Sequence, residues 1–168
     1  NAGHAMHTAI MKTRQNVNCI FHSHTRAGIA VSCMQEGLMN LSQQSGEIQD
    51  KINYYDYHLL EDPNTAACAR LGRDIGNKPL LIMRNHGLLS AANNIPEALY
   101  NLYVLENACK IQVDVLRTGA ELSVPPKAEW DKLAKMYVSP TDDIAEHVNL
   151  FWTALLRMLD RNGIDYCS

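Results

Sequence analysis

Three features are scarce in this 168-residue sequence: clusters of positive charge, long apolar runs and paired cysteines. Its 15 Lys and Arg residues are dispersed, and the net charge is −3, without the basic patch that is typical of nucleic-acid-binding proteins. The longest apolar runs cover only a few residues, far fewer than the roughly 20 that span a bilayer. We therefore expect neither nucleic acid nor a membrane among the partners.

The cysteines are odd in number, widely spaced and without a CxxC pair: Cys19, Cys33, Cys68, Cys109 and Cys167. Most have apolar sequence neighbours, where a free cysteine behaves as a small hydrophobic residue. The start of the chain has no signal-peptide pattern. Together these observations predict a reduced, cytoplasmic protein without disulfides.

The length of the chain fits one domain. Its 46% hydrophobic and 20% charged residues are ordinary for a globular protein. The chain begins with Asn1 rather than Met, and a helical pattern starts at once without a capping segment. We expect a single domain over residues 1–168, from which an N-terminal part of the natural protein is absent.

Hydrophobic periodicity predicts short strands mixed with helices. The clearest strand is Leu80–Met83, a continuous apolar run of the kind that is buried on both faces of a sheet. From Ile95 to Leu116 apolar residues recur at helical spacing and predict a long helix. Weaker patterns predict strands at 19–22, 38–41, 52–55 and 87–90, and helices at 4–14, 26–35, 62–75, 129–137 and 139–163. This order favours an α/β or α+β domain with three layers.

Three histidines follow the predicted strands. His22 and His24 end the first strand, and residues at i and i+2 of a strand share a face. His86 lies in a turn between two strands, next to Gly87. Three neutral imidazoles with an open fourth position are the ligands of many catalytic zinc sites. We predict that His22, His24 and His86 hold one divalent metal ion, which would act as a Lewis acid.

Other residues allow more than one interpretation. His4 and His7 are spaced for a second metal pair, although a structural hydrogen bond suits His7 better. Three tyrosines at positions 54, 55 and 57 could supply a general acid, but packing is favoured. Gln43 and Gln44 either line a cleft or begin a helix. A hydrolytic metal site is a weaker alternative, because it needs a carboxylate base that the sequence does not identify.

Several segments together resemble the class II aldolase/adducin family. They are Ala2–Ile10, Val17–Thr25 ending in HSHT, Leu41–Gln43, Tyr54–Tyr57, Leu81–Leu89 with RNHGLL, and Glu97–Gln112. The resemblance covers about the first 120 residues well and the remainder loosely. It implies a three-layer αβα fold with a central, mainly antiparallel sheet, a zinc-type site at His22, His24 and His86, and a homotetramer.

The resemblance also implies what the protein does. Family members cleave sugar-phosphate aldols, epimerise, dehydrate or decarboxylate, whereas the adducin branch has a structural role. We expect a metal-dependent, aldolase-like lyase that acts on a small carbonyl or hydroxy compound, with Zn²⁺ or alternatively Mn²⁺. The alternative is a non-catalytic, adducin-like module that retains the metal site. Gly3 occupies the position of the aldolases' glutamate, as in the adducin-like bacterial branch, so activity on phosphorylated sugars is not expected.

Overall fold

The computed structural model describes residues 2–58, 65–138 and 142–166. Its four-stranded sheet has the order β1-β4-β3-β2. The strands are β1 (Cys19–Ser23), β2 (Ile52–Tyr55), β3 (Leu80–Met83) and β4 (Gly87–Ala92). Strand β4 runs antiparallel to β1 and β3, whereas β2 and β3 are parallel. The sheet is therefore mainly antiparallel, as expected.

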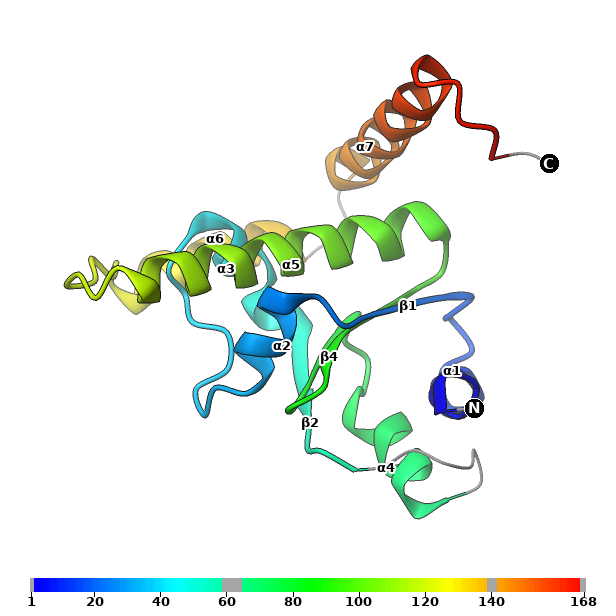
Figure 1. Ribbon diagram of the computed structural model, residues 1–168, viewed down its shortest axis with the longest axis horizontal. Coiled ribbons are helices and arrows are strands. Elements are labelled where there is room, and N and C mark those ends of the chain that lie inside the picture. The colour runs from blue at the N-terminus through cyan, green and yellow to red at the C-terminus, as the bar shows by residue number, and fades with distance from the viewer. Residues whose placement is uncertain (1, 59–64, 139–141, 167–168) are drawn as a thin grey trace.

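Helices cover both faces of the sheet (Figure 1). Helices α1 (Ala2–Thr13) and α4 (Ala66–Asp74) lie on one face, and α2 (Arg26–Ser32) and α5 (Ile95–Arg117) on the other. Strand β3 is fully buried, and its side chains alternate between two cores. Leu81 and Met83 join the core with α1 and α4, whereas Leu80 and Ile82 join the core with α5. This confirms the predicted three-layer fold.

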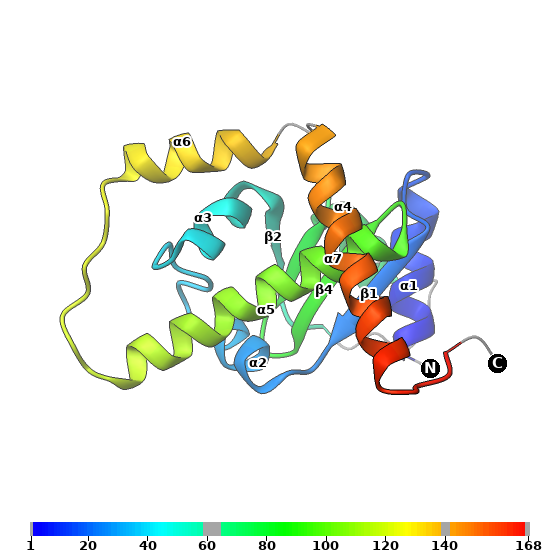
Figure 2. The same ribbon diagram turned by 90° about the horizontal axis from the view of Figure 1, so that it is seen from above.

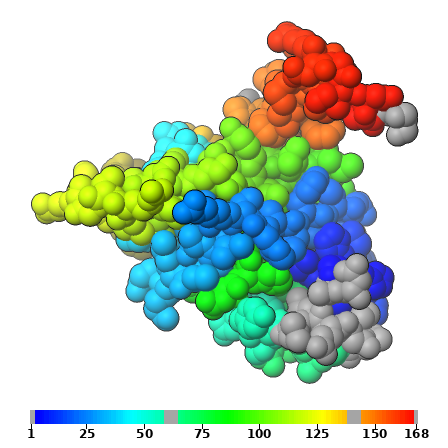
Figure 3. Space-filling model, viewed as in Figure 1, coloured from blue at the N-terminus to red at the C-terminus, as the bar shows by residue number. Residues whose placement is uncertain are grey.

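The remaining helices lie beside or beyond α5 (Figure 2). Helix α3 (Gln43–Ile48) continues into a short 3-10 helix (Gln49–Lys51) and packs against α6 (Lys127–Val138). Helix α7 (Asp142–Arg161) packs on α5 and projects from the body of the molecule (Figure 3). The predicted starts of two helices, at 62–64 and 139–141, lie outside the described residues. No described helix is both long and apolar enough to cross a membrane.

The strand predicted at residues 38–41 is wrong, because this segment forms a loop. Its backbone donors are bound by side chains rather than by a neighbouring strand. Leu38 N donates to the Tyr54 hydroxyl at 3.1 Å, and Met39 N donates to Gln112 Oε1 at 2.6 Å. The buried Gln112 also donates to the Gly37 carbonyl at 2.8 Å. Polar groups contributed from distant elements therefore replace a sheet ladder here.

Candidate metal centre

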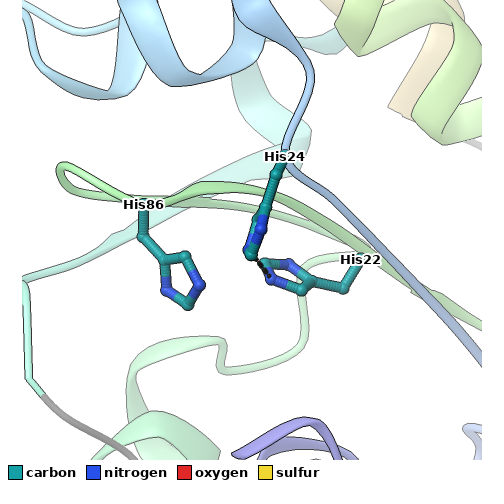
Figure 4. A group of neighbouring side chains, drawn as sticks. All are labelled: His22, His24 and His86. Carbon is teal, nitrogen blue, oxygen red and sulfur yellow. Dashed lines mark hydrogen bonds between the residues drawn. The ribbon is translucent and has the colours of Figure 1, made fainter.

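Three histidine rings converge where β1 and the β3–β4 turn end (Figure 4). His22 lies in β1 opposite Leu89 of β4, and His24 follows the last residue of β1. His86 ends the turn that precedes β4. One ring nitrogen from each histidine lies within 4.8 Å of the others. The structure therefore brings together all three side chains that the sequence predicts as metal ligands.

The ring of His22 is fixed by the backbone of β4. Its Nδ1 lies 2.9 Å from the carbonyl oxygen of Leu88, and a carbonyl oxygen only accepts hydrogen bonds. Nδ1 therefore carries the proton, which leaves a lone pair on Nε2. That Nε2 lies 2.7 Å from Nε2 of His24. Metal-binding histidines commonly donate their second nitrogen to a backbone carbonyl in this way, because the bond sets the tautomer and the ring orientation.

The surroundings favour the neutral form of His22 and His86. Burial lowers the pKa of His22 to about 4, in spite of the hydrogen bond to Leu88, which raises it. The charges of His86, His24 and His7 lower the pKa of His22 further. Burial, followed by the charge of His24, also lowers the pKa of His86. Neutral rings at pH 7 are the form that binds a metal ion.

The turn that presents His86 is closely defined by its backbone. His86 N donates to the Met83 carbonyl at 3.0 Å. Arg84 N donates to the Tyr55 carbonyl of β2 at 2.8 Å, which fastens the turn to the sheet. Asn85 has a φ of 56°, in the left-handed region where asparagine is one of the better-tolerated residues. The sequence Arg84–Asn85–His86 is therefore compatible with a tight turn, and it places a histidine at the end of that turn.

Gly87 provides the space in which the two halves of the histidine group meet. A Cβ atom at this position would overlap the carbonyl oxygen of Ser23 and lie 3.1 Å from Cδ2 of His24. Any side chain at position 87 would therefore push the end of β1 away from the turn that carries His86. This steric requirement explains why a glycine follows the histidine here.

Thr25 fixes the chain immediately after His24. Its side chain caps α2 by accepting from Gly28 N at 3.3 Å. Its hydroxyl donates to the carboxylate of Glu106 on α5. The sequence gives no signal for Glu106 as a partner of Thr25, because Glu106 lies 81 residues away. Likewise, no side-chain pattern could identify the Leu88 carbonyl, because it belongs to the backbone.

The other candidate residues lie outside the histidine group. His4 is exposed, and the half-buried His7 lies close enough to His22 for its charge to lower the pKa of His22. Tyr55 is buried and donates to the Ala67 carbonyl at 2.9 Å, which confirms a packing role for this tyrosine. Tyr57 is 57% exposed, and its ring centroid lies 6.5 Å from that of His86.

Gln43 and Gln44 begin helix α3, which was one of the two interpretations of these residues; the other was that they line a cleft. Ser42 is the N-cap, and its side chain accepts from Ser45 N at 3.3 Å. The Ser45 hydroxyl in turn accepts from Ser42 N at 3.1 Å, which completes a capping box. Ser42 and Ser45 therefore cap the start of α3.

Comparison with known proteins agrees with this fold. Residues 1–113 match the family described as the Class II Aldolase and Adducin N-terminal domain. The chain belongs to this family. It is 37% identical, over 98% of its length, to a Pseudomonas aeruginosa protein grouped by name with the class 2 aldolases. It is 39% identical to mouse alpha-adducin over 70% of its own length and 16% of that protein.

Solved structures show the same fold. An aldolase II superfamily protein from Pseudomonas syringae is 36% identical, superposes with a TM-score of 0.83 and matches 98% of this chain. An L-fuculose 1-phosphate aldolase from Glaciozyma antarctica is 20% identical, has a TM-score of 0.72 and matches 95% of this chain and 60% of its own. The chain spans 64% of the length of both Pseudomonas proteins.

The donor set fits a divalent metal ion, on which class II aldolases generally depend. Three imidazole nitrogens suit zinc and other borderline divalent ions. The His22–Leu88 bond supplies the outer support that such a ligand normally has. Among the residues described, this ligand group contains no carboxylate and no thiolate. An ion held by these three residues alone would keep a fourth position for another ligand.

Proposed function

We propose that this chain forms a metal-dependent, aldolase-like enzyme that holds one divalent ion on His22, His24 and His86. The ion is Zn²⁺, with Mn²⁺ as the alternative, and the substrate is a small carbonyl or hydroxy compound. The hydrogen bond from His22 to the Leu88 carbonyl carries this proposal, because it leaves the Nε2 lone pair facing the other two rings. A ring that served only to pack against its neighbours would not require this orientation.

The proposed reaction is carbon–carbon cleavage or a related reaction through an enediolate. A bound divalent ion supplies Lewis acidity, which stabilises negative charge on a carbonyl oxygen. The protein contributes the half-buried rings of His22 and His86, whose pKa values burial lowers, and it fixes the His22 ring through Leu88. Gly3 stands where the resemblance places the aldolases' glutamate, so we expect little or no activity on phosphorylated sugar aldols.

Turnover by the metal-loaded protein tests the enzymatic proposal. The protein would be loaded with Zn²⁺ or Mn²⁺ and incubated with a panel of small aldols and 2-keto acids, with products detected by mass spectrometry. We expect turnover of at least one compound, which His86→Ala abolishes and His147→Ala, at an exposed position on α7, leaves unchanged. Turnover that survives in His86→Ala would contradict a reaction at this site.

The second candidate is a non-catalytic, adducin-like binding or assembly module. The 39% identity to mouse alpha-adducin over 120 residues favours it, as does Gly3. In this case the histidine group would bind a metal ion without turnover. A metal-loaded, correctly assembled protein that is inactive on the whole panel would support the module over the enzyme.

We also propose a homotetramer built from single domains that span residues 1–168. Large apolar side chains are exposed on α7 and after it, at Leu150, Met158 and Ile164. Light scattering should give a mass four times the 18.8 kDa of the chain, whereas a monomeric mass would contradict the proposal. The thiols of Cys19, Cys33 and Cys109 form no disulfide, which fits the reducing cytoplasm that we propose as the location.

A further inference from the structure

We propose that Arg84 is a positioning residue of the histidine site: it holds the turn that carries His86 against the C-terminal end of α2. It thereby fixes where His86 lies relative to His24. This inference rests on the proposed metal site and adds a residue that does not itself contact the ion. Arg84 is half-buried and lies two residues before His86.

The side chain of Arg84 is bound on two sides. Its Nη1 donates to the Met34 carbonyl, just beyond α2, at 2.6 Å. Its guanidinium carbon lies 4.3 Å from the ring centroid of Tyr54, in cation–π contact. Together with the backbone bond from Arg84 N to Tyr55, these contacts join the turn to β2 and to the loop after α2. An arginine side chain that was fully exposed to solvent would make neither the hydrogen bond to Met34 nor the contact with Tyr54.

The aromatic platform beneath Arg84 is itself fixed. The Tyr54 hydroxyl accepts from Leu38 N at 3.1 Å. The Tyr54 ring lies so close to Gly37 that a Cβ there would approach Cε1 to 2.5 Å. Gly37 also has a φ of 66°, which favours glycine. The loop after α2 therefore holds the ring in one place, and the guanidinium stacks on a surface that cannot easily shift.

Helix α2 connects the two halves of the site. At its start, the cap Thr25 directly follows His24. At its end, the carbonyl of Ser32 accepts from Asn85 N at 3.1 Å, and the Arg84 bond to Met34 lies alongside. A seven-residue helix is about 10 Å long, and α2 is held at its start by the Thr25 cap. Helix α2 therefore acts as a spacer between His24 and the His86 turn, and Arg84 secures its far end.

Lysine cannot replace Arg84 fully. A guanidinium is planar and can stack on Tyr54 while it donates in its own plane to Met34, whereas an ammonium group is a compact point charge. Metal ligands need to be held within about 0.5 Å of their productive geometry. Loss of a group that hydrogen-bonds a metal ligand directly typically weakens metal affinity by about 10- to 100-fold. Because Arg84 acts through the backbone of the turn, we expect Arg84→Met to weaken affinity by about 10-fold, the lower end of this range, and Arg84→Lys by less.

Co²⁺ binding tests the proposal, because its visible absorption reports ligand geometry as well as occupancy. Wild type, Arg84→Met, Arg84→Lys and the exposed α7 control Arg157→Met would be titrated with Co²⁺ in the presence of a competing chelator. Far-UV circular dichroism and the unfolding temperature of the metal-free proteins show whether each variant is folded. We expect weakened binding and an altered spectrum for Arg84→Met, partial recovery for Arg84→Lys and no change for Arg157→Met.

The outcomes separate this inference from the proposed function. If folded Arg84→Met binds Co²⁺ like wild type while His22→Ala does not bind it, the positioning role is overturned and the metal site stands. If wild type does not bind Co²⁺ or Zn²⁺, both proposals fail. If Arg84→Met does not fold, Arg84→Lys decides: wild-type affinity and spectrum would overturn the role, and a several-fold weaker affinity would support it.

Discussion

The Nδ1 atom of His22 lies 2.9 Å from the carbonyl oxygen of Leu88, on the neighbouring strand β4. This bond links the first pair of histidines to the strand that begins immediately after His86. It also fixes the proton on Nδ1, so that Nε2 faces His24 with a lone pair. One backbone carbonyl thus sets both the orientation and the tautomer of the most deeply buried ring in the group.

Gly87→Ala should weaken metal binding without changing any ligand. The added methyl group would overlap the Ser23 carbonyl and crowd His24, so β1 and the His86 turn must move apart. Overpacking of this kind costs about 1–3 kcal/mol of stability. Isothermal titration with Zn²⁺, together with urea unfolding of the metal-free protein, measures both effects.

Gly119→Ala is the matched control for this prediction. Gly119 has a φ of 64°, but a Cβ there would meet nothing within 4 Å. The control should lose stability through backbone strain alone and keep its affinity for Zn²⁺. Equal Zn²⁺ affinities for Gly87→Ala and wild type would show that the close approach at Gly87 does not matter for the site.

Thr25→Val should destabilise the fold by about 1 kcal/mol, the usual cost of losing a helix N-cap. The substitution removes the cap of α2 and the hydrogen bond to Glu106, but it keeps the shape of the side chain. A double-mutant cycle with Glu106→Met, which removes the acceptor, isolates the Thr25–Glu106 interaction from the cap. Additive effects of the two substitutions would show that the residues do not interact.

The metal-free protein should lose stability as the pH falls from about 6.5 towards 4. In the unfolded chain His22 binds a proton near its ordinary pKa of 6.5, whereas burial in the folded protein lowers that pKa to about 4. The unfolded state therefore binds more protons in this range, and stability rises with pH. The lowered pKa values of His86 and His7 act in the same direction.

His22→Asn isolates the contribution of His22 to this pH dependence. Asparagine has an amide donor near the position of Nδ1 and can still bond to Leu88, but it does not titrate. Urea unfolding between pH 7 and pH 5 should show a shallower pH dependence for the variant than for wild type. Identical slopes would mean that His22 is not kept neutral by the fold.

Much of this site could be predicted because its ligands follow local patterns. The i, i+2 spacing places His22 and His24 together at a strand end, and the apolar run Leu80–Met83 identifies the buried strand before His86. What the sequence does not reveal depends on long-range geometry. The Leu88 carbonyl has no side-chain signature, and the partnership of Thr25 with Glu106 joins residues far apart in the chain.

The loop after α2 shows the same limit for the fold. Residues 38–41 have a strand-like composition, but their backbone donors are taken by Tyr54 and Gln112. Local preference is overridden wherever a buried polar side chain provides the hydrogen bond that a strand would otherwise need. Such side chains belong to elements that are distant in the sequence. Their hydrogen bonds to this loop therefore cannot be predicted from the sequence of the loop alone.

The most direct test of the metal site is the metal content of the purified, Zn²⁺-exposed and dialysed protein by elemental analysis. Wild type and the exposed-histidine control His147→Ala should retain about one Zn²⁺ per chain, as a single three-histidine site implies. His22→Asn, which preserves the donor to Leu88, should retain far less, as should His24→Ala and His86→Ala. Zn²⁺ content in these three variants equal to that of wild type would contradict the assignment of His22, His24 and His86 as the metal ligands.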